Sequence, residues 1–305
     1  MIFSSPIFLF IFLPAVLALY YFCRVELRNI ILLIASLTFY FWGEPKYLVL
    51  IIGLTVCNFM LEWCIESIND RKIKKVVLII SILVNFGSLF YFKYYNFAID
   101  NINLILDAHV KNKNILLPLG ISFFIFQIMS YVIDVYRKEV KAQKSLSKLA
   151  LYITLFPQLI AGPIVRYIDI EKQINRREIN SQIFYEGCRR FCIGFSKKIL
   201  IADQMAIIAD FAFSNKLNDS FTAWVGIVAY SLQIYFDFSG YSDMAIGLGK
   251  MFGFNFLENF NYPYVSCSIK EFWRRWHISL STWFRDYVYI PLGGTDVVNV
   301  RLAPI

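Results

Sequence analysis

Long apolar runs constrain this sequence more than any other feature. The clearest of them cover residues 6–22, 30–42, 47–63, 76–97, 115–136 and 221–236. About 20 apolar residues are enough for a helix to cross the hydrocarbon core of a bilayer. Two further runs, 149–164 and 191–213, are interrupted by polar residues or helix breakers. The runs predict an all-α fold, a polytopic integral membrane protein forming one domain.

Composition and charge agree with a membrane protein. The sequence is 58% hydrophobic with a mean hydropathy of +0.56, whereas soluble domains are about 45–50% apolar. Its formal net charge of +8 comes from Lys and Arg gathered in short loops between apolar runs. This is the positive-inside pattern of membrane proteins, so the lipid bilayer is the expected partner and nucleic acid is not.

The basic loops also predict an orientation. The amino terminus lacks Lys and Arg and is expected outside, as a retained first span, because it has no basic region typical of a signal peptide. The next loop contains Arg24 and Arg28, and the later segments "NDRKIKK" (69–75) and "RKEVKAQKSLSK" (137–148) are strongly basic. These three loops are expected in the cytoplasm, which leaves the loop 100–114 outside.

The alternation breaks at residues 149–164. Basic sequence flanks this run on both sides, and Pro157, Gly162 and Pro163 interrupt a helix there. We expect a re-entrant or interfacial segment. Irregular backbone at membrane depth requires shielding by protein or by a water-filled cavity, so the segment also suggests an internal tunnel or funnel.

Cysteine and histidine offer no pattern for a metal site. The six cysteines form no CxxC pair and have no histidine at ligand spacing, and the chain has only two histidines. We expect no metal, and we expect the cysteines to be small buried hydrophobic residues. His109 is expected to be an ordinary surface residue of an outside loop.

Polar residues interrupt the apolar sequence in three segments. In the first, "LLPLGISFFIFQIMSYVIDVYR", they recur at helical spacing: Gln127, Ser130, Tyr131, Asp134 and Arg137. Such a stripe is explained either by hydrogen bonds between helices or by the lining of a substrate path.

The second segment is "QIYFDFSGYSDMAIGLGKMFGFNF", where Asp237 and Asp243 flank Ser239, Gly240 and Tyr241. A carboxylate in lipid is costly, so each should face protein or water. If the helix unwinds at Gly240, its ends would form a polar pocket. The two carboxylates suggest glycosidase-like chemistry or a structural role, and the glycines that follow are only a weak match to a nucleotide-binding loop.

The third segment, "SIKEFWRRWHISLSTW", predicts one helix over residues 268–283. On that helix Lys270, Arg274, His277 and Ser281 share a face, and Glu271 and Arg275 form an i, i+4 pair. One interpretation is an interfacial anchor with tryptophans and snorkelling arginines. The other is catalytic: a neutral His277 beside fixed cations would act as a general base, with its tautomer set by Ser281.

At these residues the sequence resembles the membrane-bound O-acyltransferase family. The resemblance rests on "QIYFDFSGYSDMAIGLGKMFGFNFLENFNYPY" and "SIKEFWRRWHISLSTWFRDYVYIPLGG", supported by "LPLGISFFIFQIMSYVIDVYR", "LFPQLIAGPIVRY" and "GFSKKILIAD". It covers residues 1–294, whereas 295–305 differ in character. The ending "YIPLGG" favours the alginate-like branch over the branch that transfers D-alanine to teichoic acids.

The resemblance implies helices around a tunnel and transfer of an acyl group, acetyl in this branch, from a cytoplasmic thioester donor to hydroxyls of an exported polysaccharide. The donor would be acyl-CoA or an acyl carrier protein, with no bound cofactor. An extracytoplasmic acyltransferase is an expected partner, and the bacterial inner membrane is the expected location. Alternatives from other classes are a transporter and a non-catalytic scaffold.

The resemblance also implies site residues. His277 matches the first family histidine and is the candidate catalytic residue. Candidates for the donor or substrate path are Asp237, Ser239, Tyr241, Asp243, Trp273, Arg274, Arg275, Ser279 and Ser281. The second family histidine, in a Trp-His-Gly context, has no match here. We therefore expect a carboxy-truncated member of the family, and an inactive 305-residue form.

Overall fold

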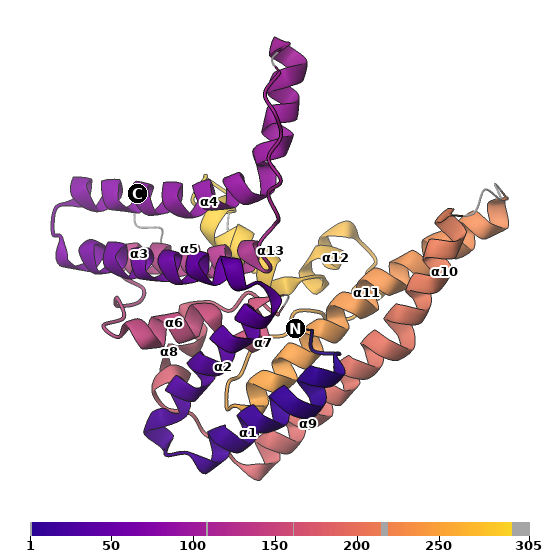
Figure 1. Cartoon of the computed structure of the whole chain (residues 1–305), viewed down its shortest axis with the longest axis horizontal. Coiled ribbons are helices and arrows are strands. Elements are labelled where there is room, and N and C mark those ends of the chain that lie inside the picture. The colour runs from indigo at the N-terminus through magenta and orange to yellow at the C-terminus, as the bar shows by residue number, and fades with distance from the viewer. Residues whose placement is uncertain (1, 108, 161, 215–218, 295–305) are drawn as a thin grey trace.

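The computed structural model describes residues 2–107, 109–160, 162–214 and 219–294, and within these ranges every regular element is helical (Figure 1). The α-helices are α1 (Leu13–Phe22), α2 (Arg28–Gly43), α3 (Leu48–Ser67), α4 (Arg71–Leu106), α5 (Ile121–Arg137), α6 (Leu146–Thr154), α7 (Phe156–Leu159), α8 (Tyr167–Asn175), α9 (Ser181–Ser196), α10 (Asp203–Ser214), α11 (Ser220–Met251), α12 (Ile269–Arg275) and α13 (Ile278–Phe284). Short 3₁₀ or π turns are η1 (Phe8–Phe12), η2 (Val25–Leu27), η3 (Pro45–Tyr47), η4 (Lys197–Ala202), η5 (Pro263–Val265) and η6 (Arg285–Tyr289). The predicted all-α class is confirmed.

Three helical segments are long and apolar enough to cross a bilayer: Val25–Gly43, Pro45–Ser67 and Arg71–Leu106. They contain the predicted runs 30–42, 47–63 and 76–97. The run 6–22 is covered by the consecutive helices η1 and α1. In the run 115–136 the helix begins only at Ile121, after Gly120 with a φ of 71°, so this segment is shorter than predicted.

A buried polar cluster joins α3 to α4. The side chains of Asn58 and Asn85 exchange hydrogen bonds of 3.0 and 2.8 Å, and the hydroxyl of Ser81 donates to Asn58 Oδ1 at 2.9 Å. All three residues are fully buried. Because apolar side chains give little preference for helix contact in lipid, such hydrogen bonds help to fix which helices pair.

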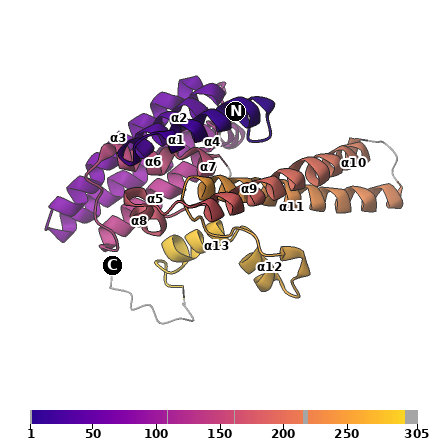
Figure 2. The ribbon, with the colours of Figure 1, turned by 90° about the horizontal axis from the view of Figure 1, so that it is seen from below.

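Glycines bring α9 and α11 into close contact, which Figure 2 shows as two long helices side by side. A Cβ on Gly194 would lie 2.5 Å from the carbonyl oxygen of Gly240, and one on Gly187 would lie 2.8 Å from that of Gly247. Gly187 and Gly194 are seven residues apart on α9, and Gly240 and Gly247 are seven residues apart on α11. Both contacts therefore lie on one face of each helix. Helix α11 continues without a break through Gly240, and the predicted unwinding there is wrong.

The run 149–164 is interrupted as the sequence predicts. Helix α6 ends at Thr154, α7 spans one turn after it, and residues 163–166 are not helical. Residues 149, 151–159 and 163–165 are buried inside the protein. Figure 1 shows α6 and α7 between α5 and α2. The shielding that irregular backbone requires is therefore supplied by neighbouring helices.

The cysteines are less buried than predicted. Cys192 and Cys267 are exposed, the other four are partly buried, and all six are free. Exposure of two thiols contradicts their interpretation as buried hydrophobic residues.

Candidate functional site

The segment containing His277 is two short helices instead of the predicted continuous one. Helix α12 ends at Arg275, and α13 begins at Ile278. His277 lies between them with φ 44° and ψ 56°, a left-handed conformation that few non-glycine residues adopt. The break turns His277 away from Lys270 and Arg274, which are exposed while His277 is buried. The four residues predicted on one face are therefore not on one face.

A short backbone pairing causes this break. The amide of Asn261 donates to the carbonyl of Arg275 at 2.9 Å, and the amide of Ile278 donates to the carbonyl of Asn259 at 2.9 Å. The ring of Phe260 packs edge-on against Trp276 at 5.1 Å. These bonds replace those that a continuous helix would make, and they place Asn259 directly beside His277.

Asn259 determines the tautomer of His277. Its Oδ1 lies 3.0 Å from Nδ1 of His277 and accepts the backbone amide of Ser279 at 3.2 Å and the Ser279 hydroxyl at 2.9 Å. An amide can only donate, so the Asn259 atom in this position is the oxygen. Nδ1 of His277 must then carry the proton, which leaves the lone pair on Nε2. Nε2 accepts no hydrogen bond within the described residues.

Aromatic rings enclose the imidazole. Phe238 of α11 meets it edge-on with ring centroids 4.7 Å apart, and Phe123 and Phe260 lie parallel to it at 6.4 Å. His277 lies outside the three candidate membrane spans. Burial in this apolar environment disfavours the charged form and lowers the pKa of His277 to about 4. The imidazole is therefore neutral at physiological pH.

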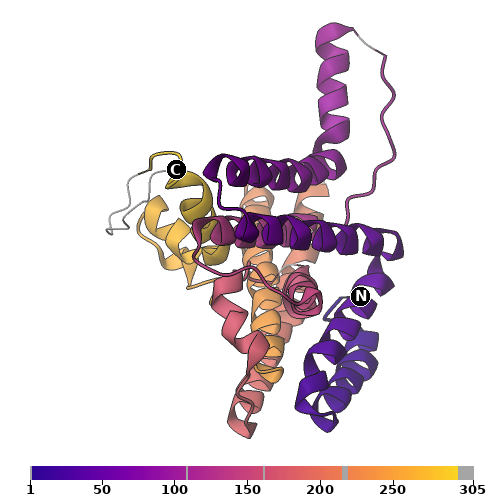
Figure 3. The same ribbon diagram turned by 90° about the vertical axis from the view of Figure 1, so that its left-hand side faces the viewer.

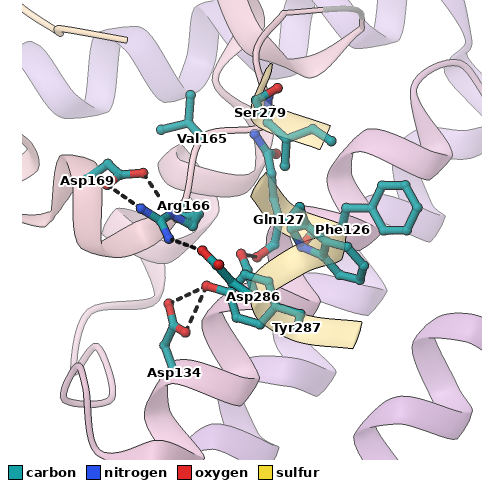
Figure 4. Close-up of polar contacts among 12 residues, drawn as sticks. Phe126, Gln127, Asp134, Val165, Arg166, Asp169, Ser279, Asp286 and Tyr287 are labelled. Atoms are coloured by element: carbon teal, nitrogen blue, oxygen red, sulfur yellow. Dashed lines mark hydrogen bonds and ion pairs between the residues drawn. The ribbon is translucent and has the colours of Figure 1, made fainter. Parts of the chain in front are cut away.

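One face of α13 and η6 attaches this segment to the rest of the protein. The hydroxyl of Ser279 accepts the backbone amide of Ile164 at 3.0 Å, and the indole of Trp283 donates to the carbonyl of Phe126 at 2.9 Å. The hydroxyl of Tyr287 donates to both oxygens of Asp134, at 2.9 and 3.0 Å (Figure 4). These contacts recur at intervals of four residues, so they fix the whole face.

Arg166 completes the attachment. Its guanidinium contacts both carboxylate oxygens of Asp169, at 3.2 and 3.3 Å, and Asp286 at 3.1 Å (Figure 4). Arg137 also donates to the carbonyl of Asp286 at 3.1 Å. The guanidinium thus bridges α8 to η6, and its flat fork of donors suits two carboxylates at once.

The polar stripe of α5 is buried among helices. Gln127, Ser130 and Asp134 are fully buried, and Asp134 is bound by Tyr287. The hydroxyl of Tyr131 accepts the amide of Gln143 at 2.6 Å. These bonds support the role of the stripe in contacts between segments. The amide group of Gln127 has no hydrogen-bond partner within the described residues, so lining of a path remains a prediction for that residue.

The two aspartates of α11 are paired with cations on its side toward α9 and η4. Asp243 accepts Arg190 at 2.6 Å and Lys197 at 2.6 Å, and Asp237 accepts Lys198 at 2.8 Å. Both satisfy the expectation that an intramembrane carboxylate faces a partner, and this pairing favours their structural role. It is Phe238, between them, that reaches His277.

The remaining predicted path residues are scattered. Ser239 is buried, and the hydroxyls of Ser239 and Tyr241 lack partners in the described structure. Tyr241 stacks on Phe3 at 4.6 Å. Trp273 and Arg274 are exposed. A path formed by these residues stays a prediction.

Two further expectations concern α12 and α13. Arg275 pairs with Glu271 at 2.8 Å, as predicted from their spacing. Ser281 donates to the carbonyls of Trp273 and Trp276, at 3.2 and 3.4 Å, so it does not set the tautomer of His277. Asn259 does, and it was not among the candidates, although it lies in the segment "ENFNYPY".

No group of three or more His, Cys, Asp or Glu side chains in the described ranges is arranged to hold a metal. His109, the second histidine, is exposed, in line with the surface position expected for it. The site around His277 therefore offers a neutral imidazole, amide and hydroxyl groups, and aromatic rings.

Comparison with known proteins identifies the family. The sequence matches the model of the membrane-bound O-acyltransferase family over residues 37–301. It is 50% identical over 299 residues to the probable alginate O-acetylase of Pseudomonas aeruginosa, covering 96% of this chain and 58% of that protein. It is 37% identical over 330 residues to the peptidoglycan O-acetyltransferase of Helicobacter pylori, covering 97% and 63%.

A third relative is the teichoic acid D-alanyltransferase of Bacillus subtilis, which is 34% identical over 193 residues, covering 60% of this chain and 48% of that protein. The chain thus spans about three fifths of the length of the alginate O-acetylase that it matches. Residues 295–305, predicted to be a distinct tail, lie outside the described residues. A family match that covers most of the sequence, together with the helical fold, shows that this chain belongs to the membrane-bound O-acyltransferase family.

Proposed function

We propose that this chain provides the His277 side of the active site of an O-acyltransferase. The enzyme would transfer an acyl group, which we infer to be acetyl, from a thioester donor to hydroxyls of an exported cell-envelope polysaccharide. The observation that supports this most directly is the bond between Asn259 Oδ1 and Nδ1 of His277. It leaves a neutral imidazole with its lone pair on Nε2, which is what a general base for a hydroxyl requires.

In the proposed reaction, Nε2 of His277 takes the proton of the acceptor hydroxyl. The hydroxyl oxygen attacks the thioester carbonyl, and the carbon–sulfur bond breaks as the tetrahedral intermediate collapses. The imidazolium returns its proton to the leaving thiolate. Asn259 accepts from Nδ1 throughout, so the ring stays oriented while its charge changes. The aromatic enclosure by Phe238 and Phe260 excludes water, which would otherwise compete as an acceptor.

Fewer side chains are free to stabilise the developing oxyanion or to bind donor phosphates than the sequence suggests. Arg275 is already paired with Glu271, and the Ser279 and Ser281 hydroxyls donate to Asn259 and to backbone carbonyls. Arg274 is exposed and forms no ion pair with the described residues. It is the candidate of these four for binding donor phosphates, from acyl-CoA or an acyl carrier protein.

The comparisons favour acetyl transfer over transfer of D-alanine. The alginate and peptidoglycan O-acetylating relatives align with 96% and 97% of the chain, whereas the teichoic acid D-alanyltransferase aligns with 60%. An extracytoplasmic acyltransferase partner, a tunnel with a re-entrant segment and a place in the bacterial inner membrane belong to the same proposal.

The test is transfer of radiolabelled acetyl from a thioester outside to a polysaccharide enclosed inside, by protein in sealed proteoliposomes. The 305-residue chain is compared with a form joined to the remaining part of the P. aeruginosa relative, each with and without His277→Ala. We expect label in the polymer from the joined form and its loss on His277→Ala. Equal transfer by the His277→Ala protein would contradict the role of His277. Label that crosses the membrane without joining a polymer would favour a transporter, and no turnover by any form would favour a scaffold.

A further inference from the structure

Helix α4 is longer than a membrane crossing requires. Its 36 residues rise about 54 Å at 1.5 Å per residue, whereas the hydrocarbon core is about 30 Å thick. Figures 1 and 3 show that its first half runs beside α3, while its second half turns away and projects from the protein. Residues 90–106, with the segment 109–114 that returns beside them, are called the arm below.

The sequence supplies a cause for the turn near the middle of α4. Gly87 and Ser88 lie there, and the Ser88 hydroxyl donates to the carbonyl of Val84 at 2.7 Å. Glycine–serine pairs and such bonds to the preceding turn both favour bending of a helix. A bend at this point separates about one bilayer-crossing length of helix from the arm.

The arm has a polar side that is covered by its own return segment. Asn96 and Asn103 each exchange two hydrogen bonds with the backbone of one residue, Lys113 and Val110 respectively, at 2.8 to 3.0 Å. The seven residues from Asn96 to Asn103 rise about 10.5 Å along the helix, and the three residues from Val110 to Lys113 span about 10 Å in extended backbone. The two asparagines and their two backbone partners are therefore equally far apart. Asn112 also donates to Asp100 at 2.7 Å.

The other side of the arm is apolar and exposed. It consists of Phe90, Tyr91, Tyr94, Phe97, Ile102, Leu104, Ile105 and Leu106, whose exposed fractions range from 41% to 84%. Asn101 lies among them and donates to the carbonyl of Phe97, and the ammonium of the exposed Lys93 lies 5.5 Å from the ring centre of Tyr94. A contiguous apolar surface of this size is rarely left to water.

We propose that the arm lies along the outer surface of the bilayer, with its apolar side in the acyl boundary of the phospholipids and its return segment toward water. The arm continues directly from a helix that faces lipid, since only 17% of the most apolar stretch of α4 is buried in protein. The division into a polar side and an apolar side, with Lys93 against the apolar ring of Tyr94, is typical of interfacial helices, where a lysine extends its ammonium to the headgroups. The basic loops predict that this end of α4 is outside.

The base of the arm matches the headgroup level. The ammonium of Lys113 lies 4.9 Å from the ring centre of Tyr95 and 5.7 Å from that of Tyr91. Tyrosine is enriched at membrane–water interfaces, where its ring is half apolar and half solvated. A lysine held above such rings is placed to contact lipid phosphate, whereas a protein partner would be expected to offer it a carboxylate.

The test places p-benzoylphenylalanine at Phe97 or, as a matched control on the return segment, at Lys111, in the whole chain in native membranes. After irradiation, we expect phospholipid adducts at position 97 and several-fold fewer at position 111. Equal adduct yields at both positions, or a protein adduct at position 97, would overturn the proposal, the latter because it would show a protein contact instead.

A second measurement does not depend on crosslinking chemistry. Nitroxide labels at Leu104→Cys and Lys111→Cys, in protein whose native cysteines are replaced by serine, report contact with oxygen in lipid and with a nickel chelate in water. We expect the oxygen-to-nickel ratio in nanodiscs to be several-fold higher at position 104 than at position 111. Equal ratios would place both sides of the arm in water and would contradict the proposal.

Discussion

Oδ1 of Asn259 lies 3.0 Å from Nδ1 of His277 and accepts two further bonds from Ser279. One side-chain oxygen therefore orients the imidazole and anchors the first turn of α13. Because these three groups are all donors, a change at Asn259 affects the chemistry of His277 and the local backbone together. Substitutions at this position have to separate the two effects.

Asn259→Ala should reduce kcat strongly with little change in KM for the acceptor. Without Oδ1, the proton of His277 is free to move to Nε2, and the base is lost in that fraction of molecules. General acid–base groups contribute about 10²–10⁴-fold to rate, so we expect a loss of about tenfold or more in the joined form. The NMR signals of ¹⁵N-labelled histidine report the tautomer directly. A kcat loss with an unchanged tautomer would contradict the positioning role.

The pH dependence of kcat/KM should lack an acid limb near pH 6.5. Burial lowers the pKa of His277 to about 4, so its base form persists down to about pH 5. In Asn259→Asp, a carboxylate beside Nδ1 stabilises the imidazolium and raises that pKa, and we expect the acid limb to move upward. Titration of both proteins with a neutral acceptor measures this. An acid limb close to pH 6.5 in the native protein would contradict the lowered pKa. It would show that water reaches His277 in the working enzyme.

Protonation of His277 should also make the folding stability depend on pH in a defined direction. The unfolded histidine has a pKa of about 6.5, whereas that of His277 in the fold is about 4. Between these values the unfolded chain binds a proton that the folded chain does not, so stability falls as pH decreases from about 6.5 to 4. Melting temperatures of the native protein and of His277→Asn across this range measure the effect. Identical pH slopes for both proteins would exclude this contribution.

Tyr287→Phe should destabilise the fold without changing the histidine tautomer. It removes the hydroxyl that donates to both oxygens of the fully buried Asp134. An unsatisfied buried polar group costs about 1–3 kcal/mol, and more if charged. Tyr289→Phe is the matched control, since Tyr289 lies in the same short helix and is exposed. Equal melting temperatures for the two variants would contradict a structural role for the Asp134–Tyr287 bond.

The sequence predicted those parts of the structure that depend on local requirements. The apolar runs 30–42, 47–63 and 76–97 predicted long helices correctly, because lipid demands that each crossing satisfy its own backbone. The break at His277 was not predictable from periodicity, since it depends on pairing with residues 259–261, which are distant in sequence. Asn259 was missed for the same reason: nothing adjacent to it marks its partner.

Glycine in α11 gave a second error with an identifiable cause. Within an apolar helix, glycine is compatible with a break or with close approach of another backbone. A glycine at position 240 does not by itself distinguish a helix break from close approach. The structure shows close approach, with Gly194 as the neighbour. The available signal for close contact was that Gly187 and Gly194 have the same seven-residue spacing as Gly240 and Gly247.

Gly247→Ala should therefore destabilise the contact between α9 and α11. A Cβ there would lie 2.6 Å from the amide nitrogen of Phe191 and 2.7 Å from the carbonyl of Gly187. Both are backbone atoms, so the helices must separate, and overpacking of this kind costs about 1–3 kcal/mol. Gly53→Ala in α3 is the control, because nothing lies within 4 Å of its added Cβ. We expect a lower melting temperature in nanodiscs for Gly247→Ala alone. Equal behaviour of the two variants would show that α9 and α11 are not held at this distance by glycine.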